Sequence, residues 1–206
     1  MHNSRTTAGL LRVVLIVVAL SGLVIGATGR AEAAPGGPQP VPKVDLSRYL
    51  GTWHQLAAIP APFNLVCARD TRAHYSLGDG GDVVVRNECT TWAGTPNTII
   101  GTAHVVDKKT SAQLRVRFPG IPNQGGPDGP PNYVIVGLGS DYSWAVVTDP
   151  SRLSGFVLSR TPALSAKNWR DVRKAIADAG QSDCLYLTSP TTGGLEETVP
   201  LCTERS

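Results

Sequence analysis

Apolar and polar residues alternate along most of the chain between residues 52 and 160, in short runs separated by glycine, proline and polar turns. In the clearest run, Leu114, Val116 and Phe118 fall on one side, opposite an amide and two arginines. A period of two residues is typical of a β-strand with one buried and one wet face. The pattern predicts eight strands, at 52–59, 70–77, 83–89, 98–106, 113–118, 133–138, 143–148 and 155–160.

Turn residues join these strands, and Gly78–Gly81 is the strongest hairpin signal. Consecutive antiparallel strands can bury one apolar face by closing on themselves, which also removes exposed sheet edges. We therefore predict an all-β fold, an eight-stranded antiparallel up-and-down β-barrel or calyx. Pro119–Pro131 is too rich in glycine and proline for regular structure and is predicted to be a long loop.

The period changes after the last strand. Trp169, Val172 and Ile176 recur three and four residues apart, which places them on one face of a helix. Ser165 is a good N-cap for this helix, and Gly180 is a good residue just beyond its end. We expect a C-terminal α-helix packed on the outside of the barrel, followed by one more short strand at 185–187.

The N-terminus has the pattern of an export signal. Arg5 and Arg12 come before or at the start of an apolar run, 13–25, which leads to the small-residue sequence Ala31-Glu32-Ala33. This pattern predicts a signal peptide over residues 1–33, cleaved after Ala33. The alternative is an uncleaved anchor, but the apolar core is shorter than the roughly 20 residues that a spanning helix needs.

The rest of the chain divides into three parts. Residues 34–43 are a proline- and glycine-rich leader, expected to be flexible or extended. Residues 44–188 form the barrel domain. Residues 189–206 are a C-terminal tail, expected to be irregular and tied by a disulfide.

Charge gives no argument for a polyanionic partner. Residues 1–33 hold three of the 19 basic and one of the 16 acidic residues, which leaves 16 and 15 and a net charge of +1. This balance does not favour nucleic acid or an anionic membrane. No cysteine stands at the cleavage site after the apolar run, so we expect no stable membrane anchor after cleavage. The predicted location is the exterior or the cell envelope.

Four cysteines in an exported chain predict two disulfides, and no spacing suggests zinc. Three pairings are possible. Cys67 begins the second strand and Cys89 ends the third, so the hairpin between them brings both to one end of the barrel. Cys184 and Cys202 flank Gly193-Gly194, which can reverse the tail. We favour Cys67–Cys89 with Cys184–Cys202.

Three motifs in order resemble the lipocalin family, most closely its bacterial outer-membrane and apolipoprotein D branches. They are Gly51-Thr52-Trp53 at the entry to the first strand, Ser140-Asp141-Tyr142 in a later turn, and Leu158-Ser159-Arg160 at the end of the eighth strand. The resemblance spans about 44–187. It also implies an alternative disulfide, Cys67–Cys202, because apolipoprotein D-like relatives tie the second strand to the tail.

The resemblance implies a closed end and an open end. Arg160 is expected to stack on Trp53 at the closed end, where Gly51, Asp141 and Tyr142 complete the structural motif. Strand parity then assigns the residues that line the interior and would bind a ligand: Ala57, Ala73, Tyr75, Val85, Asn87, Leu114, Val116, Phe118, Val147, Phe156 and Leu158. The same residues would face inward in a filled barrel without a ligand.

The sequence does not favour catalysis. His54 and His74 are predicted to point outward on different strands, which suits neither a catalytic triad nor a metal or haem site. We therefore assign no catalytic residue, no metal and no cofactor. The predicted function is to bind or transport a small hydrophobic ligand, such as a fatty acid or lysophospholipid. The alternatives are a barrel enzyme acting on a lipophilic substrate, an isomerase or hydrolase, and a ligand-free envelope interaction protein.

Overall fold

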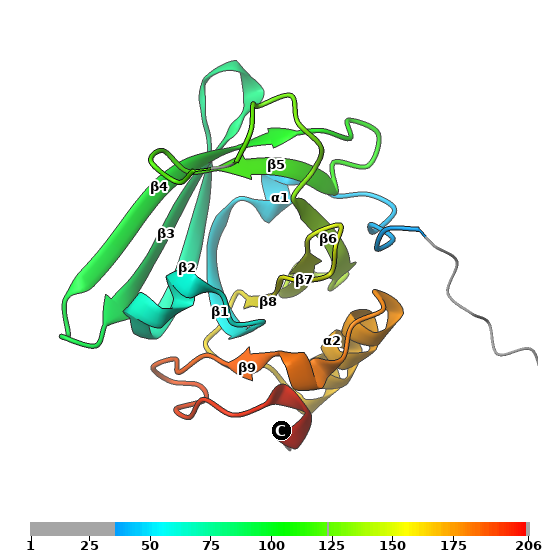
Figure 1. Cartoon of the computed structure of the whole chain (residues 1–206). Coiled ribbons are helices and arrows are strands. Elements are labelled where there is room, and N and C mark those ends of the chain that lie inside the picture. The colour runs from blue at the N-terminus through cyan, green and yellow to red at the C-terminus, as the bar shows by residue number, and fades with distance from the viewer. Residues whose placement is uncertain (1–35, 123, 205–206) are drawn as a thin grey trace, which may run out of the picture. The chain divides into compact units, whose positions relative to one another are not determined.

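Eight antiparallel strands form a ring in which each strand pairs with its neighbours in sequence, and the first closes on the eighth (Figure 1). The computed structural model describes residues 36–204 apart from 123. The strands are β1 (Gly51–Ala58), β2 (Cys67–Leu77), β3 (Val83–Thr91), β4 (Pro96–Val105), β5 (Gln113–Arg117), β6 (Tyr133–Leu138), β7 (Trp144–Thr148) and β8 (Gly155–Ser159). The predicted barrel is confirmed. The predicted signal peptide lies outside the described residues.

The two ends of the barrel differ. Short helix α1 (Leu46–Tyr49), capped by the Asp45 side chain, precedes β1 at one end of the barrel. The β2–β3 turn η2 (Asp79–Gly81) lies at the same end, because the end of β2 pairs with the start of β1, and we call this the closed end. Because successive strands run in opposite directions, the other end carries η1 (Pro62–Val66), the β3–β4 turn, the long β5–β6 loop and the β7–β8 turn. We call this the open end.

Helix α2 (Ala166–Asp178) packs on the outer wall, as predicted. Its buried residues Trp169, Val172 and Ile176 form one cluster with Trp144 and with other outward-facing residues of the barrel. The Ser165 hydroxyl accepts a hydrogen bond from the Asn168 amide, so the predicted N-cap is present. A second cluster fills the inner face of the barrel, so the protein has two cores separated by the sheet.

The C-terminal segment is built into the wall. After η3 (Asp183–Leu185), the short strand β9 (Leu187–Thr188) pairs with the end of β1, and η4 (Leu201–Thr203) follows near the end of the described chain. β1 pairs with β2 only through residues 51–54. Beyond residue 54 of β1, the C-terminal segment takes the place of β2 as its partner. The Ser189 amide donates to the Leu56 carbonyl, and the Asp70 amide of β2 donates to the Pro190 carbonyl. Residues 187–192 therefore fill the seam between β1 and β2.

The structure differs from the prediction in the extra strand and in the leader. The extra strand begins at Leu187, because 183–185 form a 3-10 turn instead. Leader residues described by the structure lie against the barrel: the Val41 amide donates to the Ile135 carbonyl at 2.8 Å, and Pro38 is buried. Among the described residues, no helix is long and apolar enough to cross a membrane. The described residues form one compact unit.

Candidate ligand-binding site

The closed end is held by an arginine clamp on Trp53. The indole is fully buried, and the Arg160 guanidinium lies 3.7 Å from the ring centroid. This guanidinium also donates to the Thr52 carbonyl at 2.8 Å and to the Arg48 carbonyl at 2.7 Å. Gly51 has a φ of +91°, and an added Cβ would lie 3.4 Å from Arg160. The ring face of the guanidinium and two of its N–H groups are thus engaged in structural contacts.

The second motif also belongs to the closed end. The Asp141 carboxylate accepts from the Ser143 amide and hydroxyl, and these bonds hold the pKa of Asp141 below its usual value. The Tyr142 hydroxyl accepts from the Asp45 amide at 2.8 Å, and the Arg48 guanidinium lies 4.0 Å from the Tyr142 ring. The motif thus fixes the β6–β7 turn to α1.

Three tyrosines form a hydroxyl chain inside the barrel. The Tyr133 hydroxyl lies 2.9 Å from that of Tyr49 and 3.0 Å from that of Tyr75, and the rings of Tyr49 and Tyr75 stack with centroids 5.7 Å apart. Burial raises the pKa of Tyr75 to about 12 and raises the pKa of Tyr49 and Tyr133 well above the usual value. All three hydroxyls are therefore neutral at physiological pH.

Most of the predicted lining residues do face the interior. Six are buried in the inner cluster, and three more pack against it while staying half-buried. The buried group is Ala73, Tyr75, Val85, Leu114, Val147 and Leu158; the half-buried group is Val116, Phe118 and Phe156. Sequence reasoning missed other inner residues, notably Tyr49 and Tyr133, which complete the hydroxyl chain.

Ala57 is the exception. A β-bulge between Gln55 and Ala57 shifts the register of β1 against β8, so Ala57 pairs with outward-facing Val157. Ala57 is accordingly buried in the outer cluster beneath α2, and Ala58, paired with Phe156, takes the inner face. A bulge adds one residue to a strand and so reverses the side of every later side chain. The inward assignment of Ala57 is wrong for this reason.

Asn87 provides a polar group on the inner wall. It pairs across the sheet with Ala73, which faces inward, and its side chain is half-buried. Its Oδ1 atom is buried and has no hydrogen-bond partner among the described residues. A buried amide oxygen without a partner costs roughly 1–3 kcal/mol, so this atom can accept a bond from a guest molecule.

The histidines do not form a site. The His74 Nδ1 lies 3.0 Å from the Thr52 hydroxyl, and the His104 Nδ1 lies 2.7 Å from an Asp82 carboxylate oxygen, while His54 lies beside Arg72 on β2. In the part of the chain that the structure describes, no two of them share a group of potential metal ligands. Burial, the largest effect, lowers the pKa of His54.

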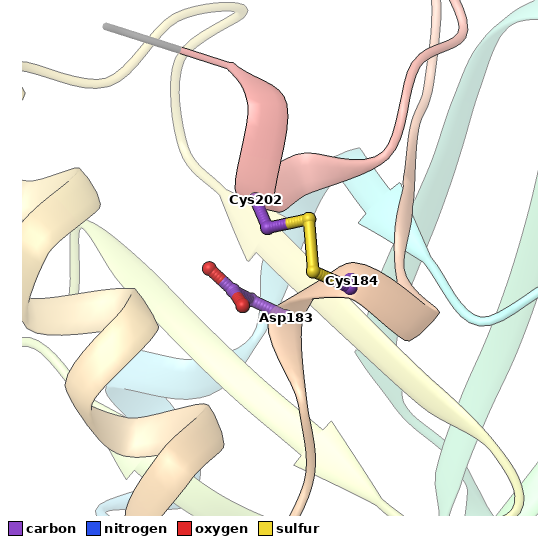
Figure 2. Close-up of side chains that lie close together, drawn as sticks. All are labelled: Asp183, Cys184 and Cys202. Carbon is purple, nitrogen blue, oxygen red and sulfur yellow. A yellow bond between two sulfur atoms is a disulfide. The ribbon is translucent and has the colours of Figure 1, made fainter.

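One cluster of potential metal ligands does occur, at the tail (Figure 2). It contains Asp183, Cys184 and Cys202, but the two sulfur atoms are bonded to each other in a disulfide and offer no thiolate. The Asp183 carboxylate lies 3.7 Å from the Arg173 guanidinium. The second disulfide joins Cys67 to Cys89, so the structure contains the favoured pairing and not the alternative Cys67–Cys202.

A family profile described as a lipocalin-like domain matches residues 44–188. The chain is a lipocalin. It is 32% identical to temperature-induced lipocalin-1 of Arabidopsis thaliana over 154 residues, which cover 70% of this chain and 78% of the relative. It is 31% identical to the outer membrane lipoprotein Blc of Citrobacter freundii over 160 residues, which cover 75% and 84%. Bovine (Bos taurus) apolipoprotein D is 34% identical over 108 residues, covering 52% and 56%.

Solved structures of two arthropod lipocalin-fold proteins share the architecture. Lobster apocrustacyanin A1 superposes on this lipocalin with a TM-score of 0.53 at 18% identity, covering 75% of this chain and 89% of the other. Insecticyanin of the tobacco hornworm Manduca sexta gives 0.54 at 16% identity, covering 79% and 93%. At these identities the likeness concerns the fold alone. Lipocalins bind small hydrophobic ligands and are generally not enzymes.

Proposed function

We propose that this lipocalin is exported and carries a small hydrophobic molecule, such as a fatty acid or lysophospholipid, inside its barrel without chemically changing it. The proposal rests mainly on one observation. Val116 and Phe118 face inward near the open end, yet they are only half-buried. A fully packed interior would bury them, so apolar surface is left that a guest can cover, at about 25 cal/mol per Å².

The polar groups of the interior suit a lipid with a small neutral or hydrogen-bonding group. Three tyrosine hydroxyls carry three protons, and the two hydrogen bonds between them use only two. One proton is therefore left to donate to a ligand oxygen. The buried Oδ1 of Asn87 can accept from a ligand hydroxyl. Arg160 is committed to Trp53 and to two carbonyls, so we do not assign it to the ligand.

Export is supported by the predicted signal peptide and by the two disulfides, which persist in oxidising surroundings. A relative named as an outer membrane lipoprotein fits a place in the envelope. Residues 1–33 lie outside the described residues, so N-terminal sequencing of the mature protein is the direct test. A first residue at Ala34 is expected.

Ligand binding in the barrel can be tested with a substitution that fills the interior with a larger side chain. The protein starting at Ala34 would be purified, analysed by native mass spectrometry for bound lipid, stripped, and titrated with a fluorescent fatty acid. Val116→Trp places an indole on the inner face and should weaken uptake at least tenfold. Thr102→Trp adds the same group on the exposed outer face of β4, where the neighbouring Ala103 pairs with Val116, and should change nothing.

Melting curves of both variants would show whether they fold. A stripped wild-type protein that takes up no fatty acid, or a folded Val116→Trp protein with unchanged uptake, would contradict binding in the barrel.

A further inference from the structure

The open end carries an unusual share of exposed apolar side chains. Among the described residues, five of the nine large apolar side chains that are exposed lie on open-end loops: Leu65, Val66, Trp92, Ile121 and Leu153. Leu65 is 74% exposed, Val66 49% and Trp92 77%. Exposed apolar groups that gather in one place mark sites of contact with other molecules. We call Leu65, Val66 and Trp92 the apolar rim.

The rim is a single fixed structure. Leu65 and Val66 belong to η1, and Trp92 lies on the β3–β4 turn beside it (Figure 1). The Trp92 indole nitrogen donates to the Leu65 carbonyl at 2.8 Å. Just below, the Cys67–Cys89 disulfide ties the two strands from which the rim projects. The loops that carry Leu65 and Trp92 are therefore joined to each other, and the two side chains are exposed on one shared structure.

Charged side chains are missing around the rim. The segments 56–68 and 89–103 contain no Asp, Glu, Lys or Arg. The nearest arginine, Arg69, is neutralised by Asp70 and Glu196, at 3.2 and 2.9 Å. The other two open-end loops do carry charges, including Asp128 and Arg152. The rim is thus the uncharged side of the open end.

Several polar groups at the tips are bonded within their own loops. In the β3–β4 turn, the Thr91 amide donates to the Thr95 carbonyl and the two threonine hydroxyls lie 2.8 Å apart. In η1, the Ala61 amide donates to the Asn64 side chain at 3.0 Å. Groups bonded internally in this way can leave water without the cost of an unpaired donor or acceptor.

We infer that the apolar rim docks the protein on the surface of a lipid bilayer. The rim exposes two aliphatic side chains and one indole, and the segments that carry it contain no charged residue. Its internally bonded polar groups can enter the headgroup boundary without losing those bonds. Because it lies at the open end, docking would bring the barrel mouth to the lipid. This inference goes beyond the proposed function, since the rim can bind a bilayer whether or not the barrel holds a ligand.

The test uses vesicles of zwitterionic phosphatidylcholine and the protein starting at Ala34. Of the four tryptophans, all of which the structure describes, Trp92 is exposed and the other three are buried. Docking should therefore shift the fluorescence emission of Trp92 to shorter wavelength, and brominated lipid should quench this fluorescence. Protein should co-sediment with the vesicles, and salt should not release it, because no charge is involved.

Two rim variants and a matched control test the location. Leu65→Asp and Trp92→Asp should each lower the bound fraction about tenfold or more. Leu77→Asp places the same charge at a site that is 68% exposed on the closed end, and it should bind like the wild type. Because all three sites are exposed, the variants should fold, and melting curves would verify this.

Four results of the vesicle experiments would each overturn the inference. They are no vesicle binding by the wild type, an equal loss in Leu77→Asp, binding that needs anionic lipid and is released by salt, and a rim-dependent dimer in place of vesicle binding. Uptake of a soluble fluorescent fatty acid, measured on the same variants, separates docking from carriage. Rim variants that keep uptake and lose vesicle binding support docking. Loss of both would place the rim in the ligand site instead and would also overturn the inference.

Discussion

Replacing Arg160 by alanine should destabilise the barrel without weakening the ligand site. The substitution removes a guanidinium 3.7 Å from the Trp53 ring centroid and two hydrogen bonds, to the carbonyls of Thr52 and Arg48. The stacking contributes roughly 0.5–2 kcal/mol. Each hydrogen bond contributes about 1 kcal/mol, since the arginine is only half-buried. The expected loss is therefore ~3 kcal/mol.

For a domain of this size, about 1 kcal/mol moves the melting temperature by roughly 2–4 °C, so Arg160→Ala should melt roughly 6–12 °C lower. Circular dichroism melting and denaturant titration would measure this loss. Arg160→Lys should fall between the two, because lysine keeps the charge but has no planar fork for two carbonyls. Arg170→Ala, at an exposed site on α2, is the matched control and should melt like the wild type.

The assay that decides between structure and function is ligand affinity per folded molecule. The closed-end placement of Arg160 predicts an affinity close to that of the wild type, measured well below the melting temperature. A loss of affinity at an unchanged melting temperature would refute the reasoning, because it would place Arg160 in contact with the ligand.

Three other perturbations follow from contacts described above. Trp169→Ala should cost ~3–5 kcal/mol in denaturant titrations, since this side chain is 2% exposed beneath α2; a loss below ~1 kcal/mol would mean that the helix does not hold the wall. The free energy of unfolding should fall as pH rises from 10 toward 12, by ~1.4 kcal/mol per pH unit for each buried tyrosine, because Tyr75 has a pKa of about 12 in the folded protein and 10.0 as its reference; Tyr75→Phe should flatten the slope, and an unchanged slope would contradict its burial. Mild reductant should open Cys184–Cys202 before Cys67–Cys89, as alkylation mapping can show, because Cys184 and Cys202 are exposed and Cys89 is buried; the reverse order would count against access as the controlling factor.

The barrel itself was predictable because local rules agree along its strands. Alternation in 113–118, turn residues at Gly78–Gly81 and the helical stripe of Trp169 each depend on neighbours a few residues away. The favoured disulfides were predictable for the same reason, since the hairpin brings Cys67 and Cys89 to one end. Local pattern and final structure therefore match in these places.

Features that depend on distant segments were not predictable. The bulge after Gln55 reverses the side of Ala57, and no glycine or proline between Thr52 and Ile59 indicates it in the sequence. The hydroxyl chain joins Tyr49 from α1 with Tyr133 from β6, 84 residues apart, and nothing in the sequence indicates that their side chains converge. The apolar rim likewise depends on how two loops lie against each other, because Leu65 and Trp92 are 27 residues apart in sequence.

The segment 187–192 changes where this protein can be shortened. Its hydrogen bonds to Leu56 and Asp70 make it part of the barrel wall. The residues that follow it are fixed by the buried side chain of Leu201 and by the Cys184–Cys202 disulfide. The family match ends at residue 188, in the middle of this insertion. Truncation there would leave the upper parts of β1 and β2 as two unpaired edges, which are templates for aggregation. We therefore expect a stable barrel only from a chain that extends at least through Cys202.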